Sequence, residues 1–400
     1  MTGSQISNSS FRPLHVLTIT PFYPKADNES AGCFVAEPLA ELAKIGVQST
    51  VYAVQPFYRP RARKVESDVN ATWFRYAAVP GGLGLSSADR GLFWRLRRPA
   101  ARLHAQNPID VIHAHGALPC GAAGLRLSEV LRIPFVVTVH GLDAFSTRQV
   151  SGWAGGLCEE VSRRVYRAAR RVIGVSQHVC EEVQRGADGL AASACKVVYN
   201  GVDPLLFAPD LGVHSGPDAE RPVVLTVGNL IPTKGHELLV QSLATLCPEF
   251  PALTWEVIGD GPELNRIREL AERLGILAKI RFRGRQNRAT VAEAFRRCTV
   301  FVLPSSYEGL GCVYLEAMAS GKAAIGCLGQ GIEEVIRHGE NGWLIRPGAG
   351  EELTERLRVL LCDASRRERI ADAGRHTVLQ SFTLARQARE LRSIYEESVG

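Results

Sequence analysis

Short apolar runs alternate with longer amphipathic segments along most of the chain. The apolar runs are rich in Val, Ile and Leu, which is typical of strands buried on both faces of a sheet. We expect strands at 14–20, 48–54, 111–114, 135–139, 171–175 and 196–199, and a second set at 223–227, 254–258, 280–282, 300–303, 323–326 and 342–345. Between them, helical periodicity predicts helices at 34–45, 159–169, 236–246, 262–274, 290–297 and 315–319.

The repeated order of strand then helix predicts an α/β fold with parallel sheets that are covered on both faces. The alternation pauses once, in the polar stretch 203–222 with its Gly and Pro residues. We therefore expect two Rossmann-like, doubly wound domains, at 1–205 and 206–400, that face a cleft. Ligands of such sheets bind just beyond the carboxyl ends of the strands, so a site is expected in the loops at those ends.

The most informative loop follows the strand expected at 300–303. Gly309, Leu310 and Gly311 lead from it into a helix. Glycines let the backbone turn tightly and keep side chains away from the start of the helix. The free N–H groups and the positive dipole end of that helix suit a diphosphate.

Two carboxylates, Glu308 and Glu316, flank this helix start. Carboxylates do not bind phosphate, but they accept hydrogen bonds from sugar hydroxyls. Glu308 would then face a transferred sugar and Glu316 a ribose. The alternative is a surface loop with a helix-capping glutamate.

A second candidate loop, 228–236, follows the strand expected at 223–227. It contains Asn229, and Lys234 comes just before the next helix. A lysine there can reach a diphosphate and stabilise a leaving nucleotide, although a lone lysine at a helix start is usually a solvated side chain. No Asp-x-Asp cluster of the kind that holds a divalent ion under a nucleotide sugar occurs. We therefore expect no metal and no cofactor.

The first half of the chain contributes a small-residue helix start at Gly32 and three histidines near strand ends. His113 and His115 lie two residues apart in a strand and so share one side of it. A metal site would need a third ligand, and none accompanies them. His115 is the better placed of the two to reach the cleft. His140 ends the next strand and is equally consistent with a structural role.

Composition limits the class of protein and its compartment. With 46% hydrophobic and 22% charged residues, the chain is globular. Ten cysteines are scattered without a CxxC pair, so we expect reduced thiols. The first residues show no basic segment before an apolar core, and no run approaches the ~20 apolar residues of a membrane span. The expected location is the cytoplasm.

The formal net charge is +6, and positive charge gathers in residues 59–102. The basic residues there are Arg59, Arg61, Arg63, Lys64, Arg75, Arg90, Arg95, Arg97, Arg98 and Arg102, against Glu66, Asp68 and Asp89. Apolar residues, among them Trp94, interleave with the arginines from 90 to 98. One interpretation is a surface for anionic membrane lipid, and the other is an ordinary helix with basic edges. No nucleic-acid-binding motif accompanies the charge, so no nucleic acid partner is expected.

Together these motifs resemble glycosyltransferase family 4, within the GT-B fold, from about residue 20 to about residue 348. The most specific parts are the paired glutamates with their glycine-rich spacer and the loop 228–235; the segments 200–203 and 331–336 are also similar. The loop at Gly32 is similar to a subset that makes cell-surface polysaccharides, including teichuronic-acid-type enzymes. The resemblance implies a retaining, metal-independent transfer, with the acceptor on the first domain and the nucleotide sugar on the second. We also expect the last helix, at about 381–400, to cross back to the first domain.

In such enzymes the glutamate at Glu308 meets the sugar hydroxyls, the one at Glu316 meets the ribose, and Lys234 matches the diphosphate lysine. The resemblance places His115 beside the reacting centre and Arg285 in the segment whose backbone meets the base. The expected nucleotide-sugar site comprises Gly32, Asn229, Lys234, Arg285, Glu308, Gly309, Leu310, Gly311 and Glu316, with His115, Lys234 and Glu308 as catalytic residues.

One departure from the family pattern concerns charge. The family usually has Arg where this chain has Asn229, and Asn lacks the fixed positive charge. Arg285 is the candidate substitute. The first helix start also has Ala31 before Gly32, where two glycines are common.

The sequence therefore predicts a hexosyltransferase-type enzyme that moves a sugar from a nucleotide diphosphate to a glycan or lipid-linked acceptor in polysaccharide or glycolipid assembly. A lipid-linked acceptor would place it peripherally on the inner face of the cell membrane. Three alternatives stay open at this point: a non-catalytic nucleotide-binding partner subunit, a glycoside hydrolase that uses Glu308 and Glu316, and a nucleotide-sugar epimerase.

Overall fold

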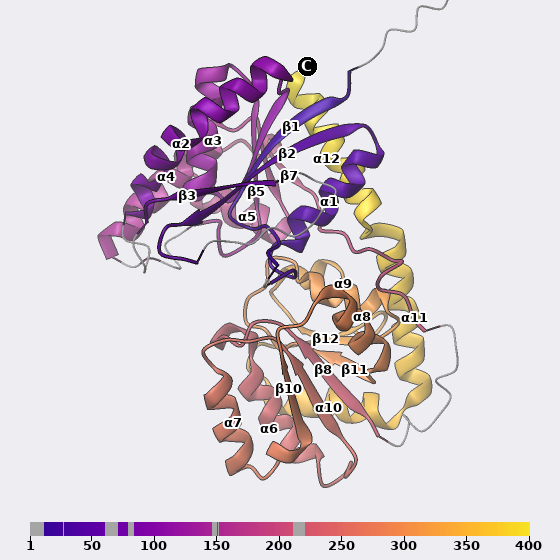
Figure 1. Cartoon of the computed structure of the whole chain (residues 1–400). Coiled ribbons are helices and arrows are strands. Elements are labelled where there is room, and N and C mark those ends of the chain that lie inside the picture. The colour runs from indigo at the N-terminus through magenta and orange to yellow at the C-terminus, as the bar shows by residue number, and fades with distance from the viewer. Residues whose placement is uncertain are drawn as a thin grey trace, which may run out of the picture.

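The computed structural model describes residues 12–26, 28–60, 71–78, 84–145, 150, 152–210 and 221–400. Its chain forms two parallel sheets in two α/β domains, one above the other in Figure 1. The predicted fold class is confirmed. Arg61, Arg63, Lys64, Glu66 and Asp68 of the basic segment lie outside the described residues, as does 211–220 of the stretch expected between the domains.

The first sheet has seven strands in the order β3-β2-β1-β4-β5-β6-β7. Their bounds are β1 Leu14–Thr20, β2 Val47–Pro56, β3 Ala71–Tyr76, β4 Val111–His115, β5 Phe135–Val139, β6 Arg171–Gly174 and β7 Cys195–Val197. Neighbouring strands are parallel throughout. The direction of winding reverses between β1 and β4, which opens a crevice at their carboxyl ends.

Strand β3 was not expected from the sequence. It lies at the edge of the sheet, and most of its side chains are half-buried or exposed. A strand in that position does not need a continuous apolar run, so the pattern used for the other strands misses it.

Helices cover both faces of the first sheet, as Figure 1 shows. Helices α2, α3 and α4 pack together on one face, and α1 lies on the other. Their bounds are α1 Cys33–Lys44, α2 Leu85–Gln106, α3 Ala122–Leu131, α4 Gly152–Ala168 and α5 Gln177–Gly186. The arginine-rich segment from 90 to 102 is therefore part of a regular helix, α2.

The second sheet repeats the plan with six strands in the order β10-β9-β8-β11-β12-β13. The strands are β8 Val223–Val227, β9 Thr254–Ile258, β10 Ile280–Gly284, β11 Val300–Val302, β12 Ala323–Cys327 and β13 Trp343–Ile345. The helices are α6 His236–Leu246, α7 Leu264–Arg273, α8 Arg288–Arg297, α9 Cys312–Ala319, α10 Gly350–Cys362 and α11 Ala364–Ser381. Winding reverses between β8 and β11, so this sheet has its own crevice.

The last helix, α12 (Leu384–Val399), runs from the second domain back to the first and packs on α1 (Figure 1). The two chain crossings between the domains lie side by side. The Val202 N–H donates to the Phe382 carbonyl (2.9 Å), and the Leu384 N–H donates to the Val202 carbonyl (3.1 Å). The two connections are therefore joined to each other by backbone hydrogen bonds.

Two smaller expectations concern thiols and membrane spans. None of the ten cysteines forms a disulfide. Within the described part of the chain, no helix has both the length and the apolar character needed to cross a membrane.

Gly201 allows the close approach of the two crossings. A Cβ at Gly201 would lie 2.4 Å from the carbonyl carbon of Thr383. We expect Gly201→Ala to lower the free energy of unfolding by about 1–3 kcal/mol, because backbone must shift to make room. Urea unfolding would measure the loss. Gly91→Ala on α2 is the control, because a Cβ there meets nothing within 4 Å; an equal loss in both variants would contradict this account.

Candidate functional site

A cleft of about 610 Å³ lies where the carboxyl ends of both sheets face each other. The first domain contributes the loop before α1 and the segment from His140 to Asp143. The second domain contributes the loops that follow β8, β10 and β11. The site therefore lies where the strand pattern predicts one.

The glycine-rich loop after β11 forms the centre of the cleft wall. Gly311 comes just before the first residue of α9. Its φ of 86° is a backbone conformation that favours glycine. A Cβ at Gly309 would lie 2.0 Å from the His140 carbonyl oxygen, so the two domains touch backbone to backbone here. Ser176 adds a hydrogen bond from its Oγ to the Gly309 carbonyl (2.6 Å). The loop thus has no side chain at Gly309 and Gly311 and is held from both domains.

Glu308 and Lys234 meet in the cleft. The Lys234 Nζ lies 2.5 Å from Glu308 Oε1, and Ser305 Oγ donates to the same oxygen (2.8 Å). Gln330 Oε1 accepts from the Glu308 backbone N–H (2.9 Å). Lys234 ends a short 3-10 turn, Pro232–Lys234, immediately before α6. The two loops that the sequence singled out are therefore joined by an ion pair.

Glu316 projects from α9 and is 3% exposed. Its Oε1 accepts a hydrogen bond from the guanidinium of Arg288 (2.5 Å). Burial raises the pKa of Glu316, and the charge of Arg288 acts in the opposite direction. The carboxylate is thus kept next to a cation inside the cleft wall.

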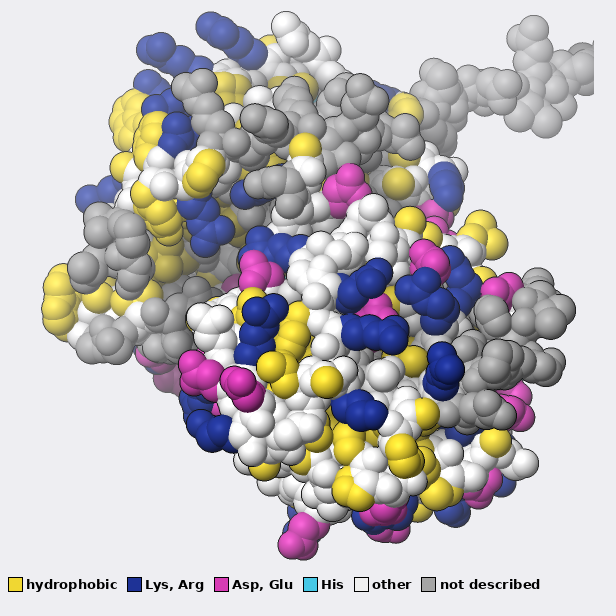
Figure 2. All heavy atoms as spheres, turned by 60° about the horizontal axis from the view of Figure 1, so that its bottom comes forward, with side chains coloured by type: hydrophobic (Ala, Val, Ile, Leu, Met, Phe, Trp, Pro, Cys, Tyr) yellow, Lys and Arg dark blue, Asp and Glu magenta, His cyan; other side chains and the backbone are white. Residues whose placement is uncertain are grey.

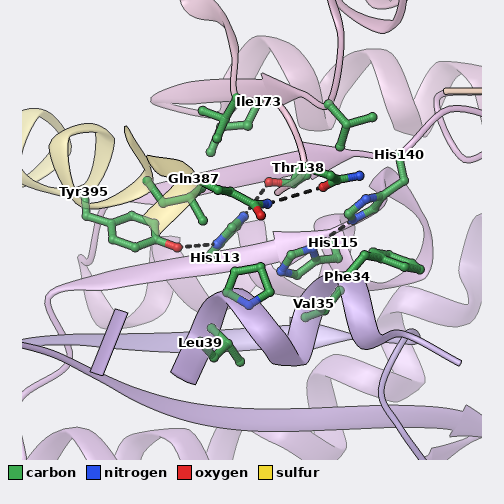
Figure 3. A pocket seen from close by; sticks show the side chains of 15 residues that line it. Phe34, Val35, Leu39, His113, His115, Thr138, His140, Ile173, Gln387 and Tyr395 are labelled. Carbon is green, nitrogen blue, oxygen red and sulfur yellow. Dashed lines mark hydrogen bonds between the residues drawn. The ribbon is translucent and has the colours of Figure 1, made fainter. Parts of the chain in front are cut away.

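Three histidines form an array at the back of the cleft, drawn in Figure 3: His113 and His115 are buried, and His140 is half-buried. His113 contacts Tyr395 Oη through Nδ1 (2.8 Å) and Thr138 Oγ1 through Nε2 (2.7 Å). His115 Nδ1 lies 2.9 Å from His140 Nε2, and these two rings stack. A cavity of about 20 Å³ lies among them, which is room for one water molecule.

Burial makes all three histidines neutral near pH 7. It lowers the pKa of His113 and of His140 to about 3. It also lowers the pKa of His115 well below its ordinary value. The array therefore supplies hydrogen bonds and shape, without a positive charge.

Most of the residues expected at the site do line the cleft: Gly32, Asn229, Lys234, Arg285, Glu308, Gly309, Leu310, Gly311 and Glu316. His115 is placed differently. It lies one layer back and bonds to His140, and it is His140 that lines the cleft. Asn229 is exposed, and Arg285 lies 3.9 Å from Asp260 Oδ2.

Sequence reasoning missed Arg288 entirely. Its partners Glu316 and Glu37 lie 28 and 251 positions away along the chain. No local motif marks such a residue, because only the fold brings the three together. Its place at the first turn of α8 resembles that of many solvated arginines.

Among the described residues, no group of three or more His, Cys, Asp or Glu side chains is arranged to hold a metal ion.

Two family models match the chain: Glycosyltransferase Family 4 over residues 34–205, and Glycosyl transferases group 1 over residues 213–377. The alpha-maltose-1-phosphate synthase of Mycolicibacterium smegmatis is 30% identical, over 72% of this chain and 79% of its own length. A Bacillus subtilis protein named for teichuronic acid biosynthesis is 25% identical, over 96% of this chain and 98% of its own. The crystal structure of Anabaena HepE with UDP and glucose superposes with a TM-score of 0.75 at 22% identity, covering 94% of this chain and 98% of that one.

The two facing sheets and the cleft between them define a glycosyltransferase of the GT-B class. The chain belongs to glycosyltransferase family 4, as its motifs indicate. Family membership sets the hydrolase and epimerase alternatives aside.

The burial of His113 predicts how the stability of the protein depends on pH. The pKa of His113 is about 3 in the fold against an ordinary 6.5, so its contribution to stability is fully present above pH 6.5 and is lost as the pH falls toward 3. Between pH 7.5 and 5.0 this costs about 2 kcal/mol. Over the same pH interval, we expect the free energy of unfolding of His113→Gln to fall by about 2 kcal/mol less than that of the wild type. Urea unfolding would measure both.

A second histidine substitution, at the surface, separates this effect from that of the other titrating groups. The exposed His376 on α11 is the control, and His376→Gln should keep the pH dependence of the wild type. If His113→Gln kept it as well, the neutral, buried state of His113 would be wrong.

Proposed function

We propose that this glycosyltransferase moves a sugar from a nucleotide-diphosphate donor to an acceptor hydroxyl with retention of configuration and without a metal ion. One observation carries the proposal. Lys234, Glu308 and Glu316 line a single cleft around the glycine-rich start of α9. A diphosphate, a hexose and a ribose need that set of groups in that order.

The diphosphate would lie against the start of α9, where free N–H groups point outward. Lys234 would supply the positive charge that stabilises the departing nucleotide. Glu308 already pairs with Lys234, so a diphosphate would share the lysine with a carboxylate that faces the sugar. Positive charge from the protein takes the place of a metal ion in this arrangement.

Retention would follow from a reaction on one face of the sugar. The bond between the anomeric carbon and the diphosphate oxygen breaks, the acceptor oxygen bonds to the same face, and the acceptor proton passes to the diphosphate. Glu308 is engaged by Lys234 and Ser305, which suits a binding role better than that of a nucleophile. His140 is neutral and suits hydrogen bonding to a hydroxyl.

The relatives guide the choice of substrates to test. HepE binds UDP and glucose, and the Bacillus subtilis relative is named for teichuronic acid biosynthesis. We propose a UDP-sugar as donor and a glycan or lipid-linked glycan as acceptor, in polysaccharide or glycolipid assembly. The acceptor would lie on the first domain.

We also propose that the first domain binds an anionic membrane surface. Trp94 is 60% exposed on α2, with the guanidinium of Arg97 3.8 Å from its ring centroid. Arg90 and Arg98 lie on the same exposed face of the helix. The one acidic residue of α2, Asp89, is buried and bonded to Arg126 (2.7 Å), so it does not neutralise that face.

Neighbouring elements extend this arginine–aromatic face. Arg95 of α2 lies over the exposed ring of Phe57, 5.0 Å from its centroid. Trp153 at the start of α4, which packs on α2, is 78% exposed. Figure 2 shows hydrophobic and basic side chains interleaved along this side of the first domain. Aromatic side chains beside arginines are typical of protein surfaces that rest on anionic lipid.

The transfer proposal is tested with UDP-glucose and water as the default acceptor. We expect Glu308→Gln to lower the rate of UDP release by about 10²-fold, because a contact to the sugar is lost while the nucleotide still binds. EDTA should leave the wild-type rate unchanged. NMR of the released glucose should show the α anomer first, since the donor is α-linked.

The exposed Glu333, near the glycine loop but outside the cleft lining, provides the matched control, and Glu333→Gln should keep the wild-type rate. UDP, GDP and ADP sugars would first be compared by thermal shift, and the most stabilising donor used. Nucleotide binding without any turnover would indicate a non-catalytic partner subunit instead. The β anomer appearing first would contradict retention.

The membrane proposal predicts binding to vesicles that contain anionic lipid. Arg90→Gln with Arg98→Gln should weaken flotation with such vesicles by about tenfold or more, since each arginine near the surface contributes about 1 kcal/mol. High salt should weaken wild-type binding in the same way.

Controls for this experiment lie on α11, on the opposite side of the molecule (Figure 1). Arg369→Gln with Leu379→Ala removes one exposed cation and one exposed apolar side chain there, and should bind as the wild type does. Equal binding to neutral and anionic vesicles, or none to either, would rule the surface out.

A further inference from the structure

Arg288 connects carboxylates from the two domains. It is the first residue of α8 in the second domain, and its side chain is 17% exposed. Its Nε and Nη2 donate to Glu37 Oε1 (2.8 Å) and Oε2 (3.1 Å), a bidentate pair with helix α1 of the first domain. Its Nη1 donates to Glu316 Oε1 (2.5 Å) on α9.

The guanidinium is held in one orientation. Its plane is rigid, and all three kinds of nitrogen are engaged, so the position of Glu316 is set relative to α1. The ring of Phe207 lies 4.7 Å from its central carbon and covers it. Next to it, Ser30 Oγ donates to the Gln286 carbonyl (3.0 Å), which joins the loops before α1 and α8.

The three charges depend on one another. Burial raises the pKa of Glu37 and of Glu316, and the charge of Arg288 opposes this at both. The charge of Asp203 also raises the pKa of Glu37, by a smaller effect. Loss of one partner leaves the others with an unbalanced buried charge, and a carboxylate in that state changes its position or protonation.

We propose that Arg288 is a positioning residue: it ties Glu316, the carboxylate assigned to the donor ribose, to Glu37 of the first domain. The proposal rests on the proposed function for that assignment. Its consequence is that the ribose subsite is complete only when the domains are closed, so nucleotide binding and closure favour each other. Glu37 itself is not among the residues that line the cleft.

The proposal is tested by measuring the affinity for UDP with titration calorimetry. If GDP or ADP stabilises the protein more, that nucleotide is used instead. Glu37→Gln should weaken binding about tenfold, although Glu37 does not face the ligand. Glu41→Gln is the matched control on the same helix, because within the described part of the chain Glu41 forms its ion pair with Lys44 at the surface. It should bind as the wild type does.

A nucleotide without ribose hydroxyls separates positioning from a general loss of structure. With the 2′,3′-dideoxy nucleotide, Glu37→Gln and the wild type should differ by less than about twofold. A merely structural defect would weaken both nucleotides equally and would overturn the proposal. Arg288→Lys keeps the charge but not the bidentate fork, so it should reproduce the effect of Glu37→Gln while a thermal-shift measurement shows that it is folded.

The variant Glu316→Gln separates a failure of the coupling through Arg288 from a failure of the ribose assignment. If it weakens binding of the ribonucleotide while Glu37→Gln does not, the coupling through Arg288 is wrong and the ribose assignment stands. If Glu316→Gln changes nothing, or no nucleotide binds, the proposed function of this subsite fails.

Discussion

The backbone contact between Gly309 and the His140 carbonyl is the constraint on which the rest of the site depends. A helix start can offer its N–H groups to a diphosphate only where no side chain covers them. In this protein the same loop also lies against the other domain at Gly309. Glycine at this position leaves no side chain at the helix start and lets the backbones of the two domains meet, so both features belong to one piece of structure.

Around that contact, charged groups are paired within the cleft. Lys234 meets Glu308, and Arg288 meets Glu316. A buried charge is costly unless it is paired, so these ion pairs keep the cleft stable before a donor arrives. They also alternate cations, which attract phosphate, with carboxylates, which accept hydrogen bonds from hydroxyls. This alternation matches the chemistry of a nucleotide sugar.

The interface contains a second acidic contact that acts on the first domain. Glu334 accepts from the backbone N–H groups of Gln177 and His178, at 2.7 Å each, and from Tyr199 Oη (3.0 Å). A carboxylate at the first turn of α5 satisfies N–H groups that have no partner within the helix. Together with the parallel chain crossings at Val202 and Leu384, such contacts give the domains a defined relative arrangement.

The sequence by itself determined both sheets, apart from edge strand β3, the loops that hold Lys234 and Glu308, and the helix that carries Glu316. Buried parallel strands need continuous apolar runs and phosphate-binding turns need glycine, so both leave local signals. Only the tertiary structure decided that His140 lines the cleft with His115 behind it, and that Arg288 joins Glu37 to Glu316. These relations depend on how separate strands and domains face each other. Contacts between side chains that are far apart in the sequence produce no local pattern of apolar and polar residues from which they could be predicted.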